Sequence, residues 1–291
     1  MLDRVAAAPI SWGICEAPGW GLQLPPRRVL GEMRDLGITA TELGALGWLP
    51  TESDALKAML GEFGLSLVGG FVPLVLHRAD LRDQLVHDAT TAARTLADGG
   101  GRHFVTAVVS SHTAWERPVV TAGEWATLFE GLALVDEICR EHGLVQVLHP
   151  HVDTLIETAA ELDRFLDHSA VQFCLDTGHL FIGGADPVVL AAKYFDRIGL
   201  VHVKDVRGSV AQRLLNDELT LMGATQAGLF PAAGAGEAPI AATIQVLEDQ
   251  GFSGWYVLEQ DVALTDGEPP VGEGPVVGVR ESIDYLRSLT V

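Results

Sequence analysis

The chain has 291 residues, of which 48% are hydrophobic and 20% are charged. This length suits one large barrel of about 250 residues, and the composition argues against a disordered chain. Lys and Arg number 19 against 39 Asp and Glu, and the resulting net charge of −20 disfavours nucleic acid and anionic membranes as partners.

Short apolar segments rich in β-branched residues alternate with longer helical patterns along the chain. The predicted strands are Ala8–Gly13, Ile38–Leu43, Leu65–Val72, His103–Ser110, Leu144–His149, Val171–Leu175, Ile198–Val203 and Trp255–Glu259. The predicted helices are Pro25–Leu36, Thr51–Phe63 (with Thr51 or Ser53 as its cap), Asp80–Ala97, Ala122–His142, Thr154–Asp167, Asp186–Asp196 and Arg280–Leu289. Because each strand precedes a helix or a helix-bearing excursion, we predict an α/β fold, a single (β/α)8 TIM barrel forming one domain over residues 1–291.

One segment departs from this alternation. Residues 220–236, after the seventh strand, carry no charge and are rich in Gly and Ala. In a barrel this segment lies at the end where active sites form, so we predict a mobile cover over a substrate, with an ordinary surface loop as the alternative.

The cysteines and apolar segments indicate the cellular setting. Cys15, Cys139 and Cys174 are scattered without metal-binding or redox spacing, which predicts free thiols in a reducing compartment. The first ten residues do not resemble a signal segment, and the longest apolar stretch, 65–76, is too short to cross a bilayer. We therefore predict a cytoplasmic protein without membrane contact.

Polar side chains gather where strands five to eight end. They are His149, His151, Asp176, His179, His202, Lys204, Glu259 and Asp261. Residues two apart on a strand face the same side, so several of these side chains can face the barrel axis together. The carboxyl ends of barrel strands carry the catalytic groups, which predicts one site at this rim.

This mixture of imidazole and carboxylate groups indicates a metal. Asp176, His202 and Glu259 each supply one ligand, and His149 supplies a fourth. Such a set favours one divalent ion of Mn, Co, Zn or Fe over Ca or Mg. Alone, a strand-end histidine is usually structural, and Asp176 alone could cap a turn. An unpaired buried carboxylate at Glu259 is harder to explain without a cation, because it would be costly.

Further residues are candidates for substrate contact. Trp12 and Trp20, near the end of strand one, are candidates for an apolar wall, with core packing as the alternative. Glu42 ends strand two and is predicted to bind a hydroxyl or to support a ligand. His112 follows strand four, and His179 is predicted to contact substrate, to ligate, or to orient a ligand.

Six motifs together resemble a known family. APISWG, TELG, HPH, DTGH, VHVKDVR and LEQD, at strands one, two and five to eight, resemble the xylose isomerase-like TIM-barrel superfamily of sugar isomerases and epimerases. Within it, the inosose dehydratases of inositol catabolism are the most similar group. The VHVKDVR motif adds Asp205 and Arg207 to the candidate substrate contacts. Many members carry Glu where His149 stands, and the dehydratases carry a His-rich triplet where this chain has Pro150.

The resemblance implies a metal-dependent carbon–oxygen lyase. Such an enzyme dehydrates an inosose (2-keto-myo-inositol) or a similar cyclic polyol ketone through an enediolate. Glu259 or His151 is the candidate base, and Lys204 or His151 the candidate acid. The alternative is a metal-dependent ketose epimerase or sugar isomerase on the same scaffold, and a non-catalytic sugar-binding barrel ranks third. The predicted partner is a small polyol or ketose, and the sequence leaves a homo-oligomer open.

Overall fold

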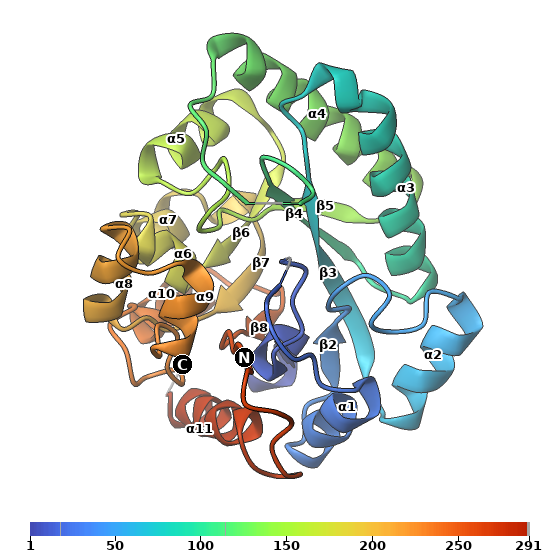
Figure 1. Cartoon of the computed structure of the whole chain (residues 1–291), viewed down its shortest axis with the longest axis vertical. Helices are drawn as coiled ribbons and strands as arrows, with labels where there is room; N and C mark the ends of the chain where they lie inside the picture. The colour runs from blue at the N-terminus through green and yellow to red at the C-terminus, as the bar shows by residue number, and fades with distance from the viewer. Residues whose placement is uncertain (18, 114, 290–291) are drawn as a thin grey trace.

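The computed structural model describes residues 1–17, 19–113 and 115–289. Parallel strands form one closed barrel in chain order, in which β8 pairs with β1 (Figure 1). The strands are β1 (Val5–Ala7), β2 (Ala40–Glu42), β3 (Ser66–Leu74), β4 (His103–Val108), β5 (Val145–Leu148), β6 (Gln172–Asp176), β7 (Ile198–Val203) and β8 (Tyr256–Leu258). This architecture confirms the predicted (β/α)8 barrel.

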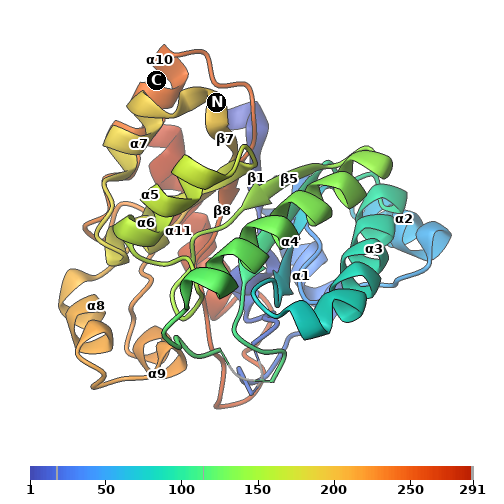
Figure 2. The same cartoon turned by 90° about the horizontal axis from the view of Figure 1, so that it is seen from above.

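Helices surround the barrel and also extend its rim. They are α1 (Pro26–Asp35), α2 (Ser53–Glu62), α3 (Arg82–Asp98), α4 (Ala122–Glu141), α5 (Ala159–His168), α6 (Thr177–Ile182), α7 (Pro187–Lys193), α8 (Gly208–Leu215), α9 (Leu221–Gln226), α10 (Ile240–Asp249) and α11 (Pro275–Ser288). Short 3-10 helices cover Leu2–Arg4, Pro9–Trp12, Ala79–Leu81 and Phe195–Arg197. Figure 2 shows α8 and α9 at the end of the barrel opposite the chain's N-terminus.

Several helix starts follow from their caps. Thr121 and Glu124 form a capping box at α4, and Thr158 and Glu161 form another at α5. Asp186 caps α7, accepting hydrogen bonds from two backbone N–H groups. The predicted cap of α2 is wrong, because Glu52 occupies that position without a side-chain hydrogen bond.

In three predicted elements a boundary lies five or more residues from its position in the structure. The first strand is Val5–Ala7, and Pro9–Trp12 of the predicted strand forms a 3-10 helix, because Pro9 lacks a backbone N–H for a strand ladder. Helix α5 begins at Ala159 rather than Thr154, whose hydroxyl donates to backbone carbonyls in a turn. Helix α11 begins at Pro275, five residues before the predicted start.

The barrel interior holds a layer of mostly small and β-branched side chains. This buried cluster consists of Ala6, Ala8, Ala40, Val68, Val105, Val147, Cys174, Leu200 and Val257. Because strand side chains alternate, the residues two positions further on also face the barrel axis, nearer the carboxyl ends. Asp176 follows Cys174, and His202 follows Leu200, in this way. The interior layer thus forms the floor beneath the polar cluster.

The described residues contain no helix long and apolar enough to cross a membrane. Cys139 and Cys174 are buried free thiols, and Cys15 is a half-buried free thiol, as predicted for the unpaired state.

Candidate active site and metal centre

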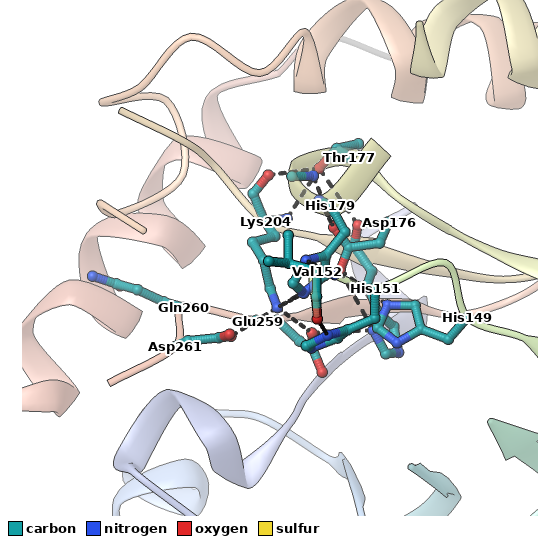
Figure 3. Close-up of polar contacts among 12 residues, drawn as sticks. His149, His151, Val152, Asp176, Thr177, His179, Lys204, Glu259, Gln260 and Asp261 are labelled. Carbon is teal, nitrogen blue, oxygen red and sulfur yellow. Dashed lines mark hydrogen bonds and ion pairs between the residues drawn. The ribbon is translucent and has the colours of Figure 1, made fainter. Parts of the chain in front are cut away.

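Four predicted metal ligands meet at the carboxyl end of the barrel. Asp176 and His202 are register partners on β6 and β7, while His149 and Glu259 directly follow β5 and β8. Each can offer one ligand atom such that all four atoms lie within 4.8 Å of one another. Their side chains are at most 7% exposed. The structure therefore brings together four groups that the sequence places at the ends of four separate strands. Figure 3 shows His149, Asp176 and Glu259 of this set.

The separations within this cluster suit a shared cation. His149 Nε2 lies 3.3 Å from Asp176 Oδ2, and His202 Nδ1 lies 3.1 Å from Glu259 Oε2. The buried Nδ1 of His202 has no hydrogen-bond partner among the described residues. A buried nitrogen of this kind is costly to leave unpaired, and a cation between it and the carboxylates removes that cost. The donor set thus fits a divalent ion with mixed nitrogen and oxygen ligands.

Glu42 orients the histidine from the other side. Its Oε1 lies 3.1 Å from His202 Nε2, and the carboxylate is 2% exposed. This contact leaves Nδ1 directed toward Asp176 and Glu259, as in carboxylate–histidine–metal arrangements. Burial alone would lower the pKa of His202, but the neighbouring Cys174 and two carboxylates raise it well above the usual value.

Lys204 lies at the centre of the remaining polar groups. Its Nζ is 2.9 Å from Glu259 Oε2 and 2.8 Å from Asp261 Oδ1. His179 Nε2 accepts a hydrogen bond from the same ammonium group at 2.9 Å. Burial alone would lower the pKa of Lys204, but the surrounding carboxylates raise it above its usual value. Lys204 is therefore a buried, fully partnered cation that balances part of the acidic cluster.

The DTGH motif makes room for this lysine. A Cβ at Gly178 would lie 2.7 Å from Cγ of Lys204, so a larger residue would displace the lysine stem. Asp176 Oδ1 accepts hydrogen bonds from the backbone N–H groups of Gly178 and His179, both at 2.8 Å. These bonds cap α6 and leave Oδ2 to face the metal cluster.

His151 has a defined tautomer. Its Nδ1 lies 2.6 Å from the carbonyl oxygen of Val152, which can only accept, so Nδ1 carries the proton. The second nitrogen, Nε2, then keeps its lone pair. Burial, together with the nearby charges of His149 and Lys204, lowers the pKa of His151 to about 3. A neutral imidazole with a lone pair is a proton acceptor, which is the role of a general base.

A cavity opens directly above these groups, and we call it the catalytic pocket. Its polar lining includes Glu16, Glu42, His151, Lys204 and Glu259. Its apolar walls are Trp20, Phe71 and Trp115. Such a mixture of aromatic walls and convergent polar groups is typical of a site for a small polar molecule.

Some predicted substrate contacts lie elsewhere. Trp12 is fully buried in the core, where its Nε1 donates to Glu32 Oε2 at 2.9 Å, so the predicted apolar wall is wrong for this residue. His112 is exposed and lines a neighbouring cavity instead. His179 lies behind Lys204 rather than on the pocket surface.

Asp205 and Arg207 form hydrogen bonds with backbone groups and do not line the catalytic pocket. Asp205 is 2% exposed and accepts hydrogen bonds from the backbone N–H groups of Gly234, Gly236 and Ala238. Arg207 donates to the carbonyl oxygen of Gly228 at 2.9 Å. Neither residue is among those that line the catalytic pocket, and their direct contact with substrate stays a prediction.

The uncharged segment 220–236 reaches the site in part. It contains α9, whose Leu221 lines the catalytic pocket, and Phe230, whose ring centroid lies 5.0 Å from Lys204 Nζ. Its predicted mobility stays a prediction. The sequence reasoning missed Glu16, Phe71 and Trp115; a lone acidic residue in the loop after the first strand was the only signal for Glu16.

Comparisons with known proteins identify the family to which this chain belongs. The family described as xylose isomerase-like TIM barrel matches residues 30–289, and the chain belongs to that family. Inosose dehydratase of Geobacillus kaustophilus is 32% identical over 275 residues, covering 90% of this chain and 89% of the relative. The rhizopine catabolism protein MocC of Rhizobium meliloti is 32% identical over 92% of this chain and 85% of its own length.

Solved structures agree on the fold. An L-ribulose 3-epimerase superposes with a TM-score of 0.71 at 18% identity, covering 98% of this chain and 93% of its own. The probable 3-DHS dehydratase AsbF of Bacillus anthracis gives 0.71 at 14% identity, covering 98% and 99%. These comparisons confirm the family resemblance predicted from the six motifs.

Proposed function

We propose that this chain is a metal-dependent carbon–oxygen lyase that dehydrates an inosose (2-keto-myo-inositol) or a similar cyclic polyol ketone. The observation that carries the proposal is the catalytic pocket, where a four-ligand centre adjoins a neutral imidazole with a free lone pair. The similarity to inosose dehydratases at 27–32% identity over about 90% of the chain supports the same reaction class.

The metal centre uses the four buried ligands. His149, Asp176, His202 and Glu259 would hold one divalent ion, which we propose to be Mn, Co, Zn or Fe. That ion would supply Lewis acidity against the negative charge that develops on the oxygen of the substrate's carbonyl group.

His151 is the group best placed to take the proton next to the carbonyl. Its Nε2 lone pair is available because Nδ1 is committed to Val152. Glu259, the other candidate base, is a proposed metal ligand, and its Oε2 already lies 3.1 Å from His202 Nδ1 and 2.9 Å from Lys204 Nζ. We therefore assign the base to His151 and keep Glu259 as a ligand. Lys204 places a fixed positive charge beside the substrate's oxygens.

The pocket lining favours an uncharged substrate. Lys204 is the only Lys or Arg among the described lining residues, and its ammonium already contacts Glu259, Asp261 and His179. Among these lining residues no free cationic side chain is left to pair with a phosphate group, so a phosphorylated sugar would meet several carboxylates without a side-chain partner. A neutral polyol ring avoids this repulsion.

An epimerase or isomerase acting on a ketose is the second candidate. It would use the same metal centre and base, and epimerase structures share the fold with TM-scores of 0.71 and 0.72. Their identities of 13–18% support the fold alone. The inosose dehydratases are more similar in sequence, so the lyase is the main proposal. We further propose a single domain over 1–291 and a cytoplasmic location.

The test is the mass of the product. Purified protein reconstituted separately with Mn, Co, Zn and Fe is incubated with scyllo-inosose, and product is followed by mass spectrometry. Loss of one water, with the ultraviolet absorbance of the enol, is expected with at least one metal. Conserved mass with altered stereochemistry would establish the epimerase instead, and no conversion of any polyol ketone would point to a binding protein.

A further inference from the structure

Dehydration requires a proton donor as well as a base. His151 can take the proton α to the carbonyl, but the β-hydroxyl leaves readily only as water, which needs a proton from a second group. The pocket must therefore contain an acid that is protonated near neutral pH and is not already committed to another partner.

Most titratable groups lining the pocket are committed. Glu42 contacts His202, while Glu259 and Asp261 contact Lys204. The ammonium of Lys204 is held by those two carboxylates and by His179, and its raised pKa makes it a weak acid.

Cys15 is also poorly suited to donate a proton. Its Sγ accepts a hydrogen bond from the N–H of Ala17 at 3.4 Å. Burial raises the pKa of this thiol far above its ordinary value, so it releases a proton reluctantly. One carboxyl group remains.

Glu16 is that group. It lies in the loop between β1 and α1, at the carboxyl end of the barrel, and its half-buried side chain lines the catalytic pocket. Among the residues that the structure describes, its carboxyl has no hydrogen-bonding side chain and no Lys, Arg or His within ion-pair distance. An acidic side chain without a cationic partner, facing other acidic side chains, is disfavoured as a carboxylate and favoured as a neutral acid.

The electrostatics agree with this geometry. Burial raises the pKa of Glu16 to about 8; a backbone hydrogen bond opposes the rise, and the charges of Glu42 and Glu259 add to it. At neutral pH the group is thus mainly protonated, as a general acid must be.

We propose that Glu16 is the general acid that protonates the departing hydroxyl group. The proposal rests on the proposed dehydration and names the residue that separates it from epimerisation, which needs no such leaving group. In the first step the Nε2 of His151 takes the α-proton, and the C–H electron pair forms the carbon–carbon double bond of an enediolate while the carbonyl π electrons move onto oxygen. In the second step that oxygen re-forms the carbonyl group, and the electron pair of the enediolate double bond shifts to the bond between the α- and β-carbons. The β C–O bond breaks, its electron pair stays on oxygen, and Glu16 donates its proton to that oxygen. The products are the unsaturated ketone, one water, a Glu16 carboxylate and a protonated His151.

A second cavity provides a route by which the Glu16 carboxylate can be protonated again. Glu16 and Cys15 also line a neighbouring cavity of about 650 Å³, which borders α3 and the loop after β2. Since Glu16 lies between the two cavities, its carboxylate can regain a proton from solvent on the outer side while the inner side holds product.

The test separates proton removal from water loss. Glu16→Gln keeps the size and neutrality of the protonated side chain but has no acidic proton. With scyllo-inosose in deuterated water, we expect dehydration to fall about 100-fold or more while deuterium still enters the α-position at a rate comparable to wild type. Metal content per chain should be unchanged. Glu16→Asp should recover part of the dehydration rate, and Glu52→Gln, an exposed matched change, should behave as wild type.

The outcomes are distinct. Glu16→Gln with wild-type dehydration would overturn the assignment while leaving the lyase intact. Equal loss of deuterium exchange and dehydration would also overturn it, because Glu16 would then act in binding or folding. If the wild-type protein exchanges the α-proton but never loses water, the proposed function itself fails.

Discussion

Glu42 Oε1 and His202 Nε2 lie 3.1 Å apart, although the two residues are 160 positions apart in the chain. The contact fixes which nitrogen of His202 faces the metal cluster, because Nε2 is occupied and Nδ1 is left 3.1 Å from Glu259. A carboxylate on the far nitrogen also makes the imidazole a more basic ligand.

Replacing Glu42 with Gln should therefore weaken metal binding. We expect about a 10- to 100-fold loss of affinity, measured by competition with a chromophoric chelator. Activity should recover when excess metal is added, since the four ligands remain. Glu52→Gln serves as the exposed control. Activity that stays low at saturating metal would show that Glu42 acts on the substrate instead.

Removing the lysine should affect turnover more than metal content. Lys204→Ala deletes the positive charge that lies between Glu259 and Asp261, so charge developing on the substrate loses its partner. We expect kcat to fall about 100-fold or more, with metal per chain close to wild type by elemental analysis. A parallel fall of both quantities would show that Lys204 mainly maintains the site's architecture.

Strand patterns predicted the fold and the convergence of the four candidate ligands, because both depend on local periodicity. Asp176, His202 and Glu259 lie at or next to the ends of buried strands, where alternation determines the direction of a side chain. The parallel barrel then brings the strand ends together. This reasoning needs no knowledge of loops.

Strand patterns could not predict the contacts that loops make. The loop that carries Glu16 is held by contacts across the whole chain: Trp20 Nε1 donates to the carbonyl oxygen of Val262, and Leu22 forms a bridge with Leu264. The predicted role of Trp12 was wrong for a related reason. Pro9 interrupts the expected strand, and the resulting 3-10 helix turns Trp12 into the core.

Asp205 should matter for stability rather than for substrate contact. Its carboxylate accepts hydrogen bonds from the backbone N–H groups of Gly234, Gly236 and Ala238, so Asp205→Asn would place an NH2 group against N–H donors. We expect a loss of about 3 kcal/mol in the free energy of unfolding, measured with denaturant. Asp249→Asn, on an exposed part of α10, should change it by less than about 0.5 kcal/mol.

Metal removal should destabilise the fold as well as abolish activity. The four ligands converge only in the folded chain, so metal binding stabilises the native state. At free metal about 100 times the dissociation constant, chelation should lower the free energy of unfolding by about 2.7 kcal/mol. Thermal melts with and without chelator test this, and Glu259→Gln should respond less. An identical melting temperature in both conditions would argue against the proposed ligand set.

The stability of the metal-free protein should fall as the solution becomes acidic. The pKa of His151 is 6.5 in an unfolded chain and about 3 in the folded one, so between these values the unfolded state binds more protons. Stability is therefore complete above about pH 6.5 and is lost as the pH falls toward 3. From pH 7 to pH 5, His151 alone should account for about 2 kcal/mol. Denaturant titrations at both pH values should show a smaller decrease in His151→Gln, whereas His87→Gln, at an exposed position, should retain the wild-type decrease.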